Sequence, residues 1–179
     1  MDAHDIAFLR DVYAGASNKY KPSPIRVLLL AEAPPEALDR HFYFEDVRRQ
    51  DALFLEIMGV LYPRLKQKFL ESKRDPVLKE DLLRHFQSDG YWLTDLCELP
   101  WSLGHQNVPR YLSELMPRLE RYITKDTPIL LIKASTYDLC YRPLLEAGYN
   151  VRDVRLPFPG SGMQRVFRER FGRAVADIA

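Results

Sequence analysis

The stretch that most constrains the fold is residues 25–35, which read IRVLLLAEAPP. The apolar run behind Arg26 is typical of a strand buried on both faces of a parallel sheet. Pro34 and Pro35 lack an N–H and have a fixed φ, so the chain must leave the sheet next to Glu32. We therefore expect Glu32 at the carboxyl end of a central strand, where open α/β sheets bind ligands. The alternative interpretation of Glu32 is a solvated loop residue.

The remaining sequence alternates between strand and helix patterns. Further strands are expected at residues 91–96, 129–132 and 151–156. Helical spacing of apolar residues predicts helices over residues 5–16, 45–61, 76–88, 107–123, 135–147 and 163–178, with Asp75, Asn107 and Ser135 as helix starts and Gly148 as a stop. This order predicts one domain over residues 1–179, a three-layer α/β/α fold around a central four-stranded parallel sheet.

Composition excludes several classes of protein. The net charge is +1, so the overall charge says little about which partners the protein binds. Cys97 and Cys140 lie far apart without a C-x-x-C motif, which gives no support to a metal site or a disulfide framework. No signal peptide or membrane-length apolar run is found. We expect a cytoplasmic protein that has no cofactor, no metal and no membrane partner.

Three of the four expected strands are followed by short segments that contain acidic residues, prolines or glycines. These segments are Glu32–Pro35, Asp95–Glu98 and Pro157–Gly162. Because parallel strands bring their carboxyl ends to one edge of the sheet, the three loops are expected to meet in a site. For Asp95 the alternative is a helix cap or a strand-end turn residue.

Two other features supply candidate binding residues. Phe42, Tyr43 and Phe44 are consecutive aromatics, which serve either as core residues or as a stacking platform beside the site. Residues 151–173 contain six arginines against two acids, which is either a solvated face or a nucleic-acid footprint.

At these residues the chain resembles the uracil-DNA glycosylase superfamily, most nearly the branch with a GEAPG first motif. LAEAPP resembles that motif, and WLTDLCELP resembles the strand that relatives write roughly as TNxxKCRPP. ILLIKASTYDLCYRPLLEAG is similar to the strand and helix with a Gly-x-x-Ala turn. LPFPGSGMQRVF stands where relatives carry HPS and a loop that enters the DNA minor groove.

The resemblance implies an enzyme that extrudes a nucleotide from DNA and breaks its glycosidic bond. It implies Glu32 as the carboxylate beside the sugar or a water, and Asp95 as the reader of the base edge. Ala33 and Pro34 would lie against the base, and Phe42, Tyr43 or Phe44 would stack on it, with Phe44 preferred. DNA contacts are expected from the loop after the fourth strand and its flanking arginines, namely Arg155, Pro159, Gly160, Ser161, Gly162 and Arg165.

The chain departs from the family pattern at three points. Asp95 replaces the Asn that matches uracil, and an ionised carboxylate only accepts hydrogen bonds, although a protonated one could mimic Asn. The HPS histidine and the iron–sulfur cysteines are absent. We therefore expect a DNA glycosylase that removes a damaged or non-uracil base. The alternatives are a catalytically silent relative that binds nucleic acid or a nucleotide, and an unrelated enzyme that acts on nucleosides.

Overall fold

The protein forms a three-stranded parallel sheet flanked by helices. The computed structural model describes residues 1–104, 107–160 and 162–178. The strands are β1 (Val27–Ala31), β2 (Tyr91–Asp95) and β3 (Ile129–Leu131), in the order β2-β1-β3. Leu29 pairs with Leu93 on one side and with Leu130 on the other, so β1 is central. The expected α/β class with a parallel sheet is confirmed.

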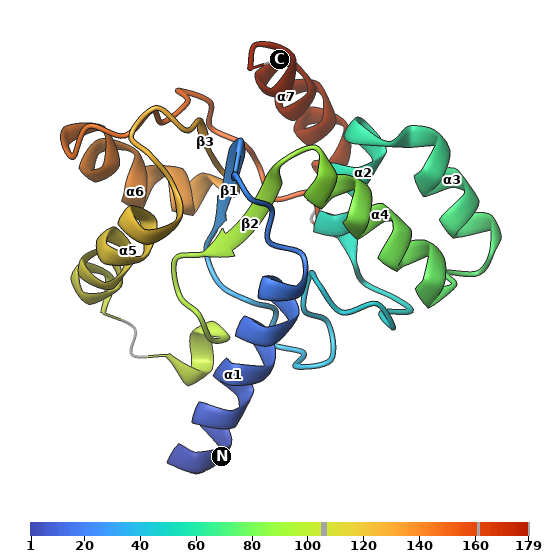
Figure 1. Ribbon diagram of the computed structural model, residues 1–179, viewed down its shortest axis with the longest axis horizontal. Coiled ribbons are helices and arrows are strands. Elements are labelled where there is room, and N and C mark those ends of the chain that lie inside the picture. The colour runs from blue at the N-terminus through green and yellow to red at the C-terminus, as the bar shows by residue number, and fades with distance from the viewer. Residues whose placement is uncertain (105–106, 161, 179) are drawn as a thin grey trace.

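Helices lie on both sides of this sheet (Figure 1). Figure 1 shows α5 and α6 on one side of the strands, and α2, α3, α4 and α7 on the other, with α1 near the carboxyl end of β2. Their bounds are α1 (Ala3–Lys19), α2 (Ala52–Leu61), α3 (Pro63–Glu71), α4 (Pro76–Ser88), α5 (Val108–Tyr122), α6 (Ala134–Glu146) and α7 (Gln164–Ala176), with a short 3₁₀ turn η1 (Trp101–Leu103).

Local sequence determines several helix ends as expected. The Asp75 side chain accepts a hydrogen bond from the Val77 N–H at 2.9 Å, and the Asn107 side chain accepts one from the Arg110 N–H at 3.2 Å. Each therefore caps a helix that has a proline in its first turn. Gly148 follows α6 with a φ of +83°, a conformation that glycine adopts without strain.

Two expected helix starts are wrong. The helix predicted from residue 45 begins only at Ala52, because Gln50 has a φ of +54° and Asp51 turns its side chain toward α4. Helix α6 begins at Ala134 behind Lys133, whose φ is +81°. Ser135 therefore lies inside the helix and makes no capping hydrogen bond.

The expected fourth strand at residues 151–156 is not formed within the described residues. Val151 makes one isolated parallel bridge with Ile129, and the Arg152 N–H donates to the Ile129 carbonyl at 2.9 Å. The Val154 N–H then turns back to the Arg152 carbonyl, also at 2.9 Å, instead of continuing the ladder. The segment runs along the edge of β3 as an irregular chain, and it still brings Phe158 and Gly160 to the carboxyl end of the sheet.

The core lies around the central strand. Leu28, Leu29 and Leu30 have no exposed surface, as the apolar run in the sequence indicates. In the part of the chain that the structure describes, no helix has both the length and the apolar character needed to cross a bilayer.

Candidate functional site

A cavity of about 470 Å³, the strand-end cavity, opens at the carboxyl ends of β1 and β2. Its walls come from the loop after β1, from the start of α2, from β2 and from the loop before α7. The lining residues are Ala33, Pro34, Pro35, Arg40, His41, Phe42, Gln50, Asp51, Ala52, Leu53, Leu93, Asp95, Phe158 and Gly160. The three loops that the sequence placed at one edge of the sheet therefore meet at this cavity.

Asp95, the last residue of β2, supplies an unpartnered carboxyl to the cavity. Arg118 donates to the backbone carbonyls of Asp95 and Leu96 at 2.8 and 3.0 Å and pairs with Glu98 at 3.0 Å. No group in the described chain forms a hydrogen bond with the side-chain carboxyl of Asp95. Burial raises the pKa of Asp95 to about 7, against the lowering effect of the Arg118 charge. Both protonation states of this carboxyl are therefore populated near neutral pH.

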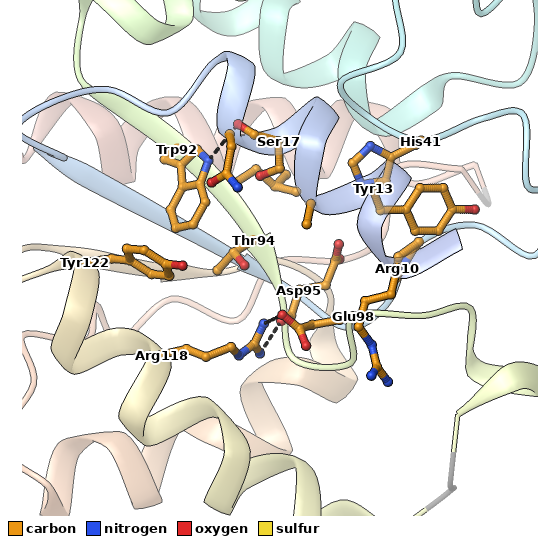
Figure 2. A pocket seen from close by; sticks show the side chains of 14 residues that line it. Arg10, Tyr13, Ser17, His41, Trp92, Thr94, Asp95, Glu98, Arg118 and Tyr122 are labelled. Carbon is orange, nitrogen blue, oxygen red and sulfur yellow. Dashed lines mark hydrogen bonds and ion pairs between the residues drawn. The ribbon is translucent and has the colours of Figure 1, made fainter. Parts of the chain in front are cut away.

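A smaller inner cavity of about 80 Å³ lies on the other side of Asp95, between α1, β2 and α5. Figure 2 shows Asp95 near its centre, with Arg118 and Glu98 below and the stacked rings of His41 and Tyr13 to one side. Asp95, His41, Pro34 and Leu93 line both the inner cavity and the strand-end cavity. These residues therefore form the partition between the two.

The three consecutive aromatics have different positions. Tyr43 is 1% exposed, and its hydroxyl donates to the Leu93 carbonyl at 3.0 Å and accepts from the Leu93 N–H at 2.7 Å. It thereby pairs the free edge of β2 and has no face left for a ligand. Phe42 is buried against Phe54 and Phe86, yet part of it lines the strand-end cavity. Phe44 is partly buried and packs on Tyr13 and His41 at ring distances of 5.8 and 5.2 Å.

Glu32 lies in an adjoining cavity of about 370 Å³, the Glu32 cavity. Ala33, Pro34, Pro35, Leu53 and Phe158 line both this cavity and the strand-end cavity, so they form a shared wall. The Glu32 carboxylate pairs with the Lys133 ammonium. Glu32 and Asp95 are thus neighbours at one edge of the sheet, but they face separate cavities.

His41 is a buried histidine of the strand-end cavity. It is 5% exposed, and its ring stacks on that of Tyr13 with a centroid distance of 4.5 Å and an angle of 10°. Its Nδ1 is buried without a hydrogen-bond partner in the described chain. Burial, with the nearby Lys79 charge, lowers the pKa of His41 to about 4, so the imidazole is neutral at physiological pH.

A buried ion pair includes Asp51, which lines the strand-end cavity, and Lys79 of α4. The Lys79 ammonium, whose side chain is fully buried, lies 2.7 Å from Oδ2 of Asp51 and 4.3 Å from the centre of the Phe54 ring. Burial raises the pKa of Asp51 and lowers that of Lys79, while each partner's charge opposes the shift of the other. The pair joins the end of the long loop after β1 to α4.

The segment expected to contact DNA is only partly at the cavity. Gly160 lines it, Pro159 is buried, and Gly162 is exposed with a φ of +79°. Arg165 is exposed on the first turn of α7. Ser161 lies outside the described residues.

Arg155 lies in a different place from the cavity. Its guanidinium forms a fork with Asp138, at 2.9 and 2.7 Å. It lines a separate groove with Arg152, Arg170 and Arg173. Both side chains of this fork are exposed, and within the described residues Arg155 lines that groove and not the strand-end cavity.

Comparison with protein-family models, with curated proteins and with solved structures finds no match to this chain. Among the described residues, no three His, Cys, Asp or Glu side chains are grouped so that they could hold a metal ion. The interpretation of the site therefore depends on its own geometry and chemistry.

Sequence reasoning missed His41, Asp51 and Lys79. A signal for Lys79 was present, because helical spacing places it on the same apolar face as Leu82, Leu83 and Phe86. A lysine on such a face must find an acid, and Asp51 is that partner. His41 gave no such signal, since its burial arises from α1 packing across the loop.

Proposed function

We propose that this chain is a DNA base-excision glycosylase-like protein that binds DNA, holds an extruded base in the strand-end cavity and hydrolyses its N-glycosidic bond. The observation that carries the proposal is the position of the Asp95 carboxyl. Asp95 is the last residue of β2, it lines the strand-end cavity, and its carboxyl has no hydrogen-bond partner in the described chain. Asp95 is partly buried and its carboxyl makes no hydrogen bond in the described chain, so it is open to a ligand that pairs with it.

The size and the lining of the cavity suit a planar heterocycle. Its volume of about 470 Å³ lies within the range of roughly 300–1,000 Å³ that small-ligand pockets occupy. Phe42, Leu53, Leu93 and Phe158 provide apolar walls, and the polar side chains of the lining are those of Arg40, His41, Gln50, Asp51 and Asp95. This combination of apolar faces with a small number of edge-reading groups is how enzymes hold flipped bases.

Asp95 can read a base edge in its protonated state. A protonated carboxyl offers one O–H donor beside an acceptor oxygen. This pair complements a ring N–H next to a carbonyl, as in uracil, hypoxanthine and xanthine. Because its pKa is raised to about 7, Asp95 can take over the role that an Asn plays in the family that the sequence resembles.

Glu32 is the carboxylate proposed to act on the sugar side of the bond. It precedes the shared wall Ala33–Pro35, and it forms an ion pair with Lys133 in the adjoining cavity. A carboxylate there would stabilise a cation-like sugar or orient a water molecule.

The second candidate function is binding without base release. The observation that favours it is the position of Glu32 in the adjoining cavity, where Lys133 already neutralises its charge. On this alternative the strand-end cavity binds a base or nucleotide and the chemistry is absent.

The experiment is an incubation of the purified protein, in excess over substrate, with oligonucleotides that contain uracil, hypoxanthine, xanthine or an oxidised pyrimidine. Alkali-labile sites are then mapped, and released bases are measured. The proposal expects release of at least one base, a loss of about 10²–10³-fold with Glu32→Gln, and a comparable loss with Asp95→Ala. Arg48→Gln, a change at an exposed residue outside both cavities, is the matched control and should retain full activity.

The two candidates differ in outcome. Binding of the oligonucleotides without any abasic site supports the second candidate and removes the enzymatic one. Absence of both binding and base release contradicts both.

A further inference from the structure

The imidazole of His41 is the one buried histidine among the described residues, and the proposed reaction assigns it no task. It lines the strand-end cavity and the inner cavity together with Asp95. Figure 2 shows its ring stacked beside Tyr13 on the wall of the cavity that Asp95 also faces.

The two ring nitrogens of His41 have different surroundings. Nδ1 is sealed from solvent and has no partner, whereas Nε2 is not sealed in this way and also makes no hydrogen bond in the described chain. Because His41 is buried and lines both cavities, we take Nε2, the ring nitrogen that is not sealed, as the one that opens onto them. A buried N–H without a partner is rarer than a buried lone pair without one. The proton is therefore best placed on Nε2, where it can be donated to a ligand.

The ring is held rigidly in this orientation. Tyr13 stacks on it at 4.5 Å, and Phe44 packs at 5.2 Å from its centroid. The Tyr13 hydroxyl in turn donates to the Leu38 carbonyl at 3.2 Å. A donor fixed in this way loses little conformational entropy when a ligand binds.

We propose that His41 is a second ligand-contacting residue of the strand-end cavity, and that its Nε2–H donates to an acceptor on the edge of a bound nucleobase beside the group that Asp95 contacts. The inference rests on the proposed function in taking the ligand to be a nucleobase. Together, a fixed donor and the Asp95 oxygens select a planar ring with an acceptor next to a donor on one edge, and they disfavour a ring whose edge N–H is methylated.

The test is a titration of the 179-residue chain, labelled with ¹⁵N-histidine, with free uracil, hypoxanthine, cytosine and adenine. The chain has only four histidines, so comparison with the His41→Phe variant assigns the His41 signal. The proposal expects the His41 Nε2 resonance to move on addition of at least one base while those of the exposed His4 and His85 stay in place. It also expects 3-methyluracil, which lacks the edge N–H, to bind more weakly than uracil.

Affinities of variants separate a binding role from a structural one. His41→Phe keeps an aromatic ring against Tyr13 and should raise the dissociation constant of the bound base about tenfold without lowering the melting temperature. His41→Gln, which restores an N–H donor, should recover part of the affinity. His85→Phe on the exposed face of α4 is the matched control and should change neither quantity.

The outcomes distinguish this inference from the proposed function. If oligonucleotides lose a base and His41→Phe reacts and binds like the unmodified protein, the inference about His41 is wrong and the function stands. If no oligonucleotide loses a base but free bases move the His41 resonance, the inference stands without the reaction. If no base moves the resonance, the inference is overturned, whichever way the oligonucleotide experiment ends.

Discussion

The strand-end cavity and the Glu32 cavity share a wall, but the acids at the two strand ends, Asp95 and Glu32, differ in whether they have a partner. Glu32 forms an ion pair with Lys133, and Asp51, which also lines the strand-end cavity, forms one with the buried Lys79. Asp95 has no such partner in the described chain, and burial raises its pKa to about 7. The difference separates acids that hold the structure together from an acid that is available to a ligand.

The largest effect is expected from breaking the buried pair. Lys79→Met leaves Asp51 as an uncompensated buried charge, which costs about 3–5 kcal/mol of the free energy of unfolding. Lys68→Met on the exposed face of α3 is the matched control and should change it by less than about 0.5 kcal/mol. Both are measured by urea denaturation. A Lys79→Met protein as stable as the control would mean that Asp51 needs no partner and that its ion pair does not stabilise the fold.

The next effect concerns Asp95 and depends on pH. Its pKa is raised from 3.8 to about 7, so the folded protein holds a proton that the unfolded chain releases over this interval. Stability contributed by Asp95 is therefore present below pH 4 and is lost as pH rises to 7. One pKa unit corresponds to about 1.4 kcal/mol, so Asp95→Asn should gain at most about 4 kcal/mol over the unmodified protein above pH 7.

At pH 4 the same substitution should be nearly neutral. Urea denaturation across pH 4 to 8 therefore gives a difference between the two proteins that grows with pH. A difference in the free energy of unfolding that stays constant with pH would show that the pKa of Asp95 is not raised by burial.

A smaller effect tests the structural role of Tyr43. Tyr43→Phe removes the hydroxyl that bonds both the N–H and the carbonyl of Leu93, and it should cost about 1–3 kcal/mol. Tyr62→Phe, which removes an exposed bond to Asp89, should cost less than about 1 kcal/mol. Equal losses in thermal or urea denaturation would argue against pairing of the β2 edge by Tyr43.

The smallest effect is expected at Glu32. Its pair with Lys133 is partly exposed, with 21% and 41% of the two side chains accessible, so Glu32→Gln should change stability by less than about 1 kcal/mol. The affinity for a free base should also be unchanged within about twofold, because the base lies across the shared wall. A large loss of base affinity, measured by calorimetry, would mean that the two cavities act as one.

Much of the fold could be predicted from the sequence because it depends on local patterns. The apolar run after Arg26, the cap at Asp75 and the glycine after α6 act within a few residues of themselves. The prediction of a strand at residues 151–156 was wrong. The apolar pattern suits a strand, but the pairing with β3 ends after one bridge between Val151 and Ile129. That ending depends on the neighbouring strand, which is only three residues long.

The location of the candidate site could be predicted, but the ion-pair partners of its side chains could not. Parallel topology brings the strand ends together whatever their side chains, and this placed Asp95 at a cavity. The partners of each group come from distant segments: Lys79 reaches Asp51 across 28 positions, and Lys133 reaches Glu32 across 101. The local pattern can mark a buried lysine such as Lys79, but it does not show which acid pairs with which base, so Glu32 and Asp95 look alike in the sequence.

The most direct test of the account is the titration of the Asp95 side-chain carboxyl by ¹³C NMR, with and without a saturating free base that binds the protein. The account predicts a midpoint near pH 7 in the free protein and a midpoint that moves when the base occupies the strand-end cavity. A midpoint near 4 in the free protein, or one that the bound base leaves unchanged, would contradict it.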